Sequence, residues 1–126
     1  MTKTFRIVAV VDDDSSLLKA LERLLHTQPW TTKTFRSAKE FLASLPDGLP
    51  DCLIADLHMP EMSGLELQQT LASRGVKIPT VIITSDTDPA ARQRCLAAGA
   101  VGYLLKPVHR AELFAVIDAA SAGEGN

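Results

Sequence analysis

The sequence has few aromatic residues, only two cysteines and no long apolar run. Aromatic residues make up 5% of the 126 residues, with one tryptophan and one tyrosine. Cys52 and Cys95 have neither metal-ligand spacing nor the pattern of a disulfide framework. We therefore expect both cysteines to be small, buried apolar side chains in a protein of the reducing cytoplasm.

Signals for a membrane or for nucleic acid are also missing from the sequence. No apolar run approaches the roughly 20 residues that cross a membrane, and the polar segment 1–6 is too short for a signal peptide. Thirteen Lys and Arg against fifteen Asp and Glu leave a net charge of −2. We expect no membrane association, and no direct DNA binding by these residues, because a phosphate backbone needs a basic stripe.

Length and composition fit one globular domain. Apolar residues make up 46% of the chain, and a domain of this length hides roughly two thirds of its unfolded surface on folding. We expect that domain to span residues 1–122. The Gly-rich segment 123–126 is expected to be a loose tail.

Short β-branched and aliphatic runs recur without polar alternation, which is typical of strands buried on both faces. These runs are Ile7–Val11, Cys52–Ala55, Thr80–Ile83 and Val101–Leu105. A fifth run, Thr31–Phe35, is less apolar, as expected of an edge strand. The runs predict five strands.

Segments with helical periodicity follow each strand. Helices are predicted over about residues 17–25, 37–45, 64–74, 89–99 and 113–120, and Ser37 with Glu40 has the spacing of a capping box. Strands and helices that alternate five times predict an α/β fold with a parallel sheet and helices on both faces. In such sheets, ligands bind outside the carboxyl ends of the strands.

Polar and charged residues follow the predicted strands at that edge. They are Asp12, Asp13 and Asp14, then Asp56, then Thr84 and Ser85, and finally Lys106. Carboxylates from two strands repel each other unless a cation lies nearby. Lys106 supplies one cation, and a hard divalent ion with oxygen ligands, most simply Mg²⁺, supplies another.

These groups fit phosphoryl transfer, which depends on positioning and charge neutralisation. An aspartate is a competent nucleophile, because its side chain forms acyl phosphates. Charge alone leaves the choice of aspartate open: Asp56 stands singly, whereas Asp12 and Asp13 are adjacent and better suited to a metal. The Thr84 hydroxyl is placed to donate to a phosphoryl oxygen.

The motifs at this edge resemble the receiver domains of two-component response regulators over almost the whole chain. They are Val10–Asp14, Asp56–Gly64, Val81–Ser85, Gly99-Ala100 and Tyr103–Pro107. The segment Asp56–Gly64 is similar to the nitrogen-fixation and LuxR-type branch of DNA-binding regulators. The resemblance implies a flavodoxin-like (βα)5 fold with a five-stranded parallel sheet in the order 2-1-3-4-5.

The resemblance also implies roles for single residues. Asp56 would accept a phosphoryl group from the phosphohistidine of a sensor histidine kinase. Asp13, Asp56 and the backbone carbonyl of His58 would bind Mg²⁺ or Mn²⁺, and Asp12 would act through a metal-bound water. Lys106 would pair with a phosphoryl oxygen.

A switch is implied as well. Thr84 would move toward the new phosphoryl oxygens and vacate space for the Tyr103 ring, which would repack the face of the fourth helix, fifth strand and fifth helix. That face would change partner or dimer contacts. The Lys106-Pro107 bond would be a cis peptide.

His58 and Asp86 lie two positions past Asp56 and Thr84. Our hypothesis is that together they set the rate of phosphoryl hydrolysis by positioning or blocking the attacking water. Asp14, by contrast, is expected to be a helix N-cap.

Several functions remain open. We expect the receiver part of a transcriptional regulator, which would reach DNA only through a C-terminal effector domain; the alternative is a stand-alone regulator that acts as a phosphate sink or a protein-interaction switch. Such a protein is no turnover enzyme and catalyses only its own phosphorylation and slow dephosphorylation. A haloacid-dehalogenase-type phosphatase is a remote alternative, since Asp12–Ser16 imitates its motif poorly. A degenerate, unphosphorylated receiver is disfavoured because every motif residue is present.

Overall fold

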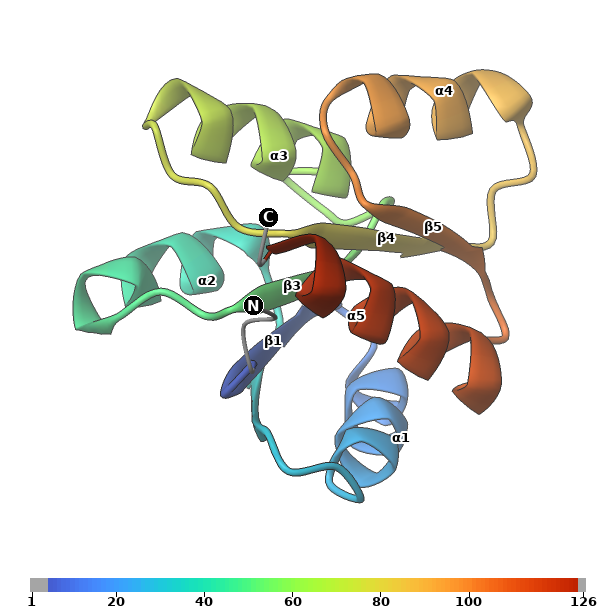
Figure 1. Cartoon of the computed structure of the whole chain (residues 1–126). Coiled ribbons are helices and arrows are strands. Elements are labelled where there is room, and N and C mark those ends of the chain that lie inside the picture. Colours follow the sequence, from blue (N-terminus) through green and yellow to red (C-terminus); the bar gives the residue numbers. More distant parts are fainter. Residues whose placement is uncertain (1–4, 125–126) are drawn as a thin grey trace.

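Five parallel strands form one sheet in the order β2-β1-β3-β4-β5 (Figure 1). The computed structural model describes residues 5–124. Its strands are β1 (Ile7–Val11), β2 (Thr31–Phe35), β3 (Cys52–Asp56), β4 (Thr80–Thr84) and β5 (Gly102–Leu105). The predicted flavodoxin-like fold is confirmed, including the strand order and the place of β2 at an edge.

Helices cover both faces of this sheet. They are α1 (Ser15–Leu25), α2 (Ala38–Ser44), the short 3-10 helix η1 (Leu45–Asp47), α3 (Gly64–Ser73), α4 (Pro89–Ala97) and α5 (Arg110–Glu124). Figure 1 shows α1 and α5 on one face, and α2, α3 and α4 on the other. No helix within residues 5–124 is both long enough and apolar enough to cross a membrane.

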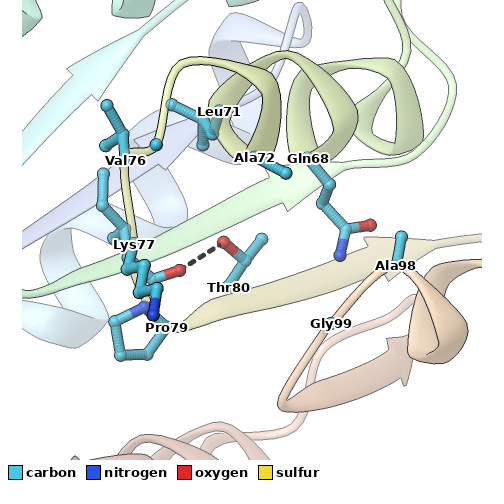
Figure 2. A pocket seen from close by; sticks show the side chains of 11 residues that line it. Gln68, Leu71, Ala72, Val76, Lys77, Pro79, Thr80, Ala98 and Gly99 are labelled. Carbon is cyan, nitrogen blue, oxygen red and sulfur yellow. Dashed lines mark hydrogen bonds between the residues drawn. The ribbon is translucent and has the colours of Figure 1, made fainter.

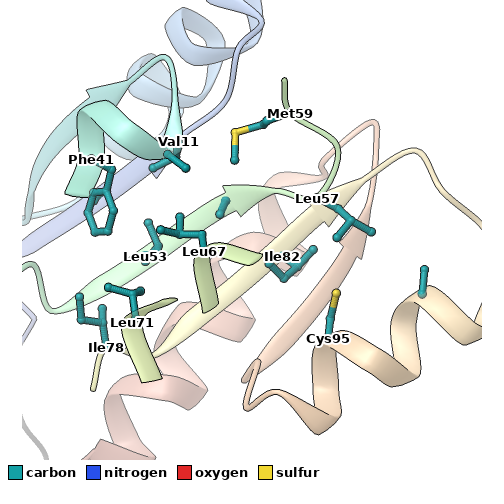
Figure 3. Close-up of a cluster of buried hydrophobic side chains, with 14 residues drawn as sticks. Val11, Phe41, Leu53, Leu57, Met59, Leu67, Leu71, Ile78, Ile82 and Cys95 are labelled. Atoms are coloured by element: carbon teal, nitrogen blue, oxygen red, sulfur yellow. The ribbon is translucent and has the colours of Figure 1, made fainter. Parts of the chain in front are cut away.

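The strands are apolar on both sides because each side meets helices. Along β1, Ala9 and Val11 belong to the core beneath α2, α3 and α4, whereas Val8 and Val10 belong to the core beneath α1 and α5. Figure 3 shows the first core, where Phe41 and other helical side chains meet the strands. Both cysteines are fully buried, as expected.

Side-chain caps fix where the helices near the carboxyl edge begin. Oδ1 of Asp14 accepts hydrogen bonds from the backbone N–H groups of Ser16 and Leu17 at 2.9 and 3.2 Å, which confirms Asp14 as the N-cap of α1. Ser63 and Glu66 form a full capping box at α3, a cap that the sequence analysis did not locate. These caps hold the loops that carry the site.

The end of the chain differs from the prediction. The α5 helix continues past Ala120 to Glu124, because the segment Asp118–Ala122 is rich in alanine and contains no helix breaker. Residues 125 and 126 of the expected tail lie outside the described residues. The domain bounds at residues 1–122 stay a prediction.

Candidate functional site

Strand register brings the predicted site residues together at the carboxyl edge of the sheet. In the ladder between β1 and β3, Val11 pairs with Ala55, so that Asp12 and Asp56 follow side by side. In the ladder between β4 and β5, Thr84 pairs with Leu105, and Lys106 comes next. Four strands therefore deliver their polar side chains to one place.

Three aspartates form a cluster there. One carboxylate oxygen each from Asp12, Asp13 and Asp56 lies within 4.8 Å of the others. Asp12 is fully buried, Asp56 is 5% exposed, and Asp13 faces solvent. Oxygen ligands at this spacing, with one of them open to solvent, fit a hard divalent cation such as Mg²⁺.

Lys106 supplies a positive charge inside this cluster. Its Nζ lies 3.1 Å from Oδ2 of Asp12 and 3.3 Å from Oδ1 of Asp56. Burial alone lowers the pKa of Lys106, but its hydrogen bonds and charge interactions with both carboxylates outweigh burial and raise the pKa above its ordinary value. Lys106 is therefore a fixed ammonium group.

One lysine does not fully offset the acidic charge. The pKa of Asp56 is raised above its ordinary value, first by burial and next by the charge of Asp12, against the opposing effect of Lys106. The ionised form of Asp56 is thus destabilised in the protein alone, and a second cation nearby would stabilise it.

The chain approaches Asp56 closely at Gly64. A Cβ atom on Gly64 would lie 2.6 Å from the backbone oxygen of Asp56, so only glycine fits there. The backbone N–H of Gly64 donates to the carbonyl of Leu57 at 2.9 Å. The start of α3 is therefore packed directly against the end of β3.

Thr84 and Tyr103 both contact the backbone of Asp86. The N–H of Asp86 donates to Oγ1 of the buried Thr84 at 3.0 Å, and the Tyr103 hydroxyl donates to the carbonyl of Asp86 at 3.3 Å. Burial raises the pKa of Tyr103, so its hydroxyl stays a donor at neutral pH. The loop from β4 to α4 thus links the two residues predicted to form the switch.

The side chains of His58 and Asp86 meet as well. Nε2 of His58 lies 2.8 Å from Oδ2 of Asp86, with the His58 side chain 66% exposed. Hydrogen bonds from the Asp88 backbone N–H and from His58 lower the pKa of Asp86. This pair joins the β3–α3 and β4–α4 loops, which flank Asp56.

Two further features lie next to the site. The peptide bond between Lys106 and Pro107 is cis. Glu61, which the sequence analysis did not single out, has a positive φ of 68° and forms an ion pair with Lys39. No sequence signal marks this turn, because Gly and Asn are the residues usual at positive φ.

A pocket of about 470 Å³ lies far from these residues, near the amino end of β4 (Figure 2). Its lining includes Gln68 of α3 and Gly99 after α4. The Thr80 hydroxyl there donates to the carbonyl of Ile78 at 2.9 Å. None of the clustered aspartates lines this pocket. We take the acidic cluster as the candidate site because it combines carboxylates and an ammonium group.

Comparisons with known proteins identify similar chains. A family model described as "Response regulator receiver domain" matches residues 8–118. The response regulator protein TodT of Pseudomonas putida is 35% identical over 120 residues, which cover 95% of this chain and 53% of TodT. The DNA-binding transcriptional regulator NtrC of Salmonella typhimurium is 40% identical over 114 residues, which cover 90% of this chain and 24% of NtrC.

Solved structures agree with the sequence comparisons. The crystal structure of FixJ-N is similar with a TM-score of 0.86 and 34% identity, and the match covers 94% of each chain. Sequence and fold are thus similar to those of response regulators.

Proposed function

The chain belongs to the response regulator receiver domain family, and from this premise we propose that Asp56 accepts a phosphoryl group from a histidine kinase. Receiver domains are signalling switches of two-component systems, they interact with histidine kinases and they generally depend on Mg²⁺. One observation carries the assignment to these residues: three carboxylates from two strand ends lie together, and two of them, those of Asp12 and Asp56, contact the ammonium group of Lys106.

Asp13, Asp56 and the backbone carbonyl of His58 would hold the divalent ion, and Asp12 would act through a metal-bound water. The donor set supports this proposal because all the ligands are hard oxygens, which suit Mg²⁺ or Mn²⁺. When bound, the ion supplies positive charge that offsets the carboxylates and the incoming phosphoryl oxygens. Asp13, the exposed member, is the one placed to meet an ion arriving from solvent.

In the transfer step, a carboxylate oxygen of Asp56 attacks the phosphorus of the phosphohistidine. The new P–O bond forms as the P–N bond breaks, and the bond electrons return to the imidazole nitrogen of the kinase. Lys106 pairs with a phosphoryl oxygen, since its ammonium already lies beside Asp56. Thr84 accepts a hydrogen bond from the Asp86 N–H, which leaves its own proton free to donate to another phosphoryl oxygen.

The same contacts provide a route for the signal. When Thr84 turns toward the phosphoryl group, it loses its hydrogen bond to Asp86, and Asp86 is also the acceptor for Tyr103. The Tyr103 ring then turns inward and repacks the face formed by α4, β5 and α5. Leu105 is 48% exposed on that face, beside a pocket of about 510 Å³ that Tyr103 also lines, and both suit a dimer or partner contact.

His58 and Asp86 tune the lifetime of the phosphoryl group in this proposal. Their hydrogen-bonded side chains connect the two loops that flank Asp56. They restrict the approach of water to the acyl phosphate from that side. In this proposal the pair slows hydrolysis by restricting water, and neither side chain acts as a catalytic base.

The chain spans about half the length of TodT and about a quarter of NtrC. We propose that residues 1–122 are the receiver domain of a cytoplasmic transcriptional regulator, which contacts DNA through a separate effector domain. The similarity to NtrC, a DNA-binding transcriptional regulator, supports this output. A stand-alone regulator that acts as a phosphate sink is the second candidate.

Incubation with acetyl phosphate and Mg²⁺ tests the function. We expect one acyl phosphate per chain and no sustained release of phosphate from a small phosphoester. Steady hydrolysis of the phosphoester would favour the phosphatase alternative. Absence of any labelling would favour a degenerate receiver used as a scaffold.

A further inference from the structure

The side chain of Gln68 in α3 is buried with one end of its amide unpaired. Gln68 is 5% exposed, and its Nε2 donates to the backbone carbonyl of Cys95 in α4 at 3.2 Å. Because a carbonyl only accepts hydrogen bonds, this contact fixes which end of the amide faces that carbonyl. Oε1 of Gln68 is buried and has no hydrogen-bond partner within residues 5–124.

The neighbours of Gln68 do not require this amide. The carbonyl of Cys95 also accepts from the backbone N–H of Ala100 at 3.0 Å, so it stays paired without Gln68. An apolar side chain of similar size would leave no polar group unpaired there, whereas glutamine leaves a buried acceptor that destabilises the folded state. A buried polar group of this kind indicates a partner from outside the chain.

The pocket of about 470 Å³ near the amino end of β4 lies beside Gln68. Figure 2 shows the Gln68 amide reaching from α3 into this space, with its oxygen turned toward Ala98 at the end of α4. The apolar part of the lining consists of Leu71, Ala72, Val76, Ile78, Pro79 and Ala98. A volume of this size, with a mostly apolar lining and few polar groups, is typical of small-molecule sites.

The polar side chains of the pocket select the chemistry of its ligand. Oε1 of Gln68 is an acceptor, and the Thr80 hydroxyl already donates its proton to the carbonyl of Ile78, so Thr80 also offers only an acceptor. The ligand therefore needs a hydrogen-bond donor. Lys77 lines the pocket as well and is exposed, and its positive charge disfavours an ammonium donor. A neutral donor such as a hydroxyl group needs no counter-charge when it is buried.

We propose that the pocket between α3, α4 and the amino end of β4 binds a small, neutral and mostly apolar molecule that donates a hydrogen bond to Oε1 of Gln68, with phenols as its simplest class. The apolar lining buries the body of this ligand, and its donor satisfies the acceptor that the chain leaves unpaired. The acidic cluster lies at the opposite, carboxyl edge of the sheet. The inference therefore does not depend on phosphorylation of Asp56.

Two probes that differ in one group test this site. Para-ethylphenol carries a hydroxyl group where para-ethyltoluene carries a methyl group of similar size. In titrations followed by backbone amide NMR shifts, we expect para-ethylphenol to cause saturable shifts centred on Gln68, Val76 and Gly99, which line the pocket. Gln68→Met should weaken para-ethylphenol binding about 3–10-fold, because the hydrogen bond is lost. It should leave para-ethyltoluene binding unchanged or stronger.

Two further variants and a stability measurement control this comparison. Gln69→Met is the matched control, since Gln69 is the next residue of α3, is exposed and does not line the pocket, and it should leave both affinities unchanged. Ala98→Leu keeps the acceptor but fills space beside it, and should weaken both probes. The urea midpoint of Gln68→Met should equal or exceed that of the unchanged protein, because an unpaired acceptor has been removed.

Four results would overturn the inference. Shifts that are absent, or that centre on residues outside the pocket, would show that the pocket binds no such molecule. Equal para-ethylphenol affinities for Gln68→Met and the unchanged protein would show that Oε1 does not accept the hydrogen bond. Undiminished binding of both probes in Ala98→Leu would place them elsewhere. A lowered urea midpoint in Gln68→Met, or a failure of this variant to fold, would show that the amide serves the fold instead.

Discussion

Nε2 of His58 lies 2.8 Å from Oδ2 of Asp86, which joins the two loops that flank Asp56. Since we propose that this pair restricts the approach of water, we expect His58→Ala and Asp86→Ala to shorten the phosphoryl half-life by about 2–10-fold, the effect of a free-energy change of about 0.4–1.4 kcal/mol in the hydrolysis barrier. The half-life is measured from the decay of phosphorylated protein at saturating Mg²⁺.

Lys39→Ala is the matched control for that prediction. Lys39 contacts the same loop through Glu61 but on the side of α2. At saturating Mg²⁺ its half-life should equal that of the unchanged protein. Unaltered half-lives in both His58→Ala and Asp86→Ala would rule out a role for the pair in hydrolysis.

The Mg²⁺ dependence of phosphorylation should require the Asp13 carboxylate. Asp13 is the exposed carboxylate of the cluster, and it does not contact Lys106 in the described structure. We expect Asp13→Asn, or chelation of Mg²⁺, to slow labelling by acetyl phosphate at least tenfold, equivalent to about 1.4 kcal/mol, without loss of the folded state. Circular dichroism checks the fold, and full labelling of Asp13→Asn would contradict the metal assignment.

Asp56→Asn should stabilise the protein in Mg²⁺-free buffer at neutral pH. The folded-state pKa of Asp56 lies above its ordinary value of 3.8, so the folded protein binds that proton more tightly than the unfolded chain does. The ionised Asp56 carboxylate therefore lowers the free energy of unfolding. This destabilisation is fully present above the folded-state pKa and disappears as the pH falls below 3.8. We expect Asp56→Asn to have the higher free energy of unfolding at pH 7.

The pH series supplies the control for this gain. Urea unfolding of both proteins between pH 7 and pH 4 should show the two free energies of unfolding converging toward acid. A gain that grows as the pH falls would have the wrong sign for a raised Asp56 pKa.

Lys106→Met should have the opposite effect on stability. Its removal leaves Asp12 and Asp56 without their ammonium partner, and Asp12 is fully buried. Because the Lys106 side chain is 21% exposed, we expect a loss of about 1–3 kcal/mol, less than for a fully buried pair. Asp12→Asn in the same background should restore part of the loss, and no restoration would show that the carboxylates are not its cause.

Activation should change association through the face of α4, β5 and α5. Beryllofluoride, which mimics the phosphoryl group, should raise the sedimentation coefficient from that of a monomer toward that of a dimer. Leu105→Arg should abolish this increase, because it places a charge on the exposed apolar position of that face. A sedimentation coefficient that beryllofluoride leaves unchanged would count against dimerisation as the output.

The strands and the site edge were predictable because they depend on local composition. Runs such as Ile7–Val11 and Thr31–Phe35 have the same bounds in the sequence prediction and in the structure. Parallel strands necessarily end at one edge, so the residues after them converge on it, as the distances from Lys106 to Asp12 and Asp56 show.

Features that depend on tertiary packing escaped the sequence. The positive φ of Glu61 arises because Leu57 and Gly64 fix the two ends of its loop, and neither residue reports on the turn between them. The sequence analysis placed His58 and Asp86 together beside the site, but the direct hydrogen bond between these residues, 28 positions apart, comes only from the structure. The extension of α5 was missed because the expected tail was inferred from its glycines alone.

Intact-protein mass measurement after incubation with acetyl phosphate and Mg²⁺ tests the central role of Asp56 most directly. The unchanged protein should gain the mass of one phosphoryl group, and Asp56→Asn should gain none. The same mass increase in Asp56→Asn would place the acceptor on another residue and contradict the account.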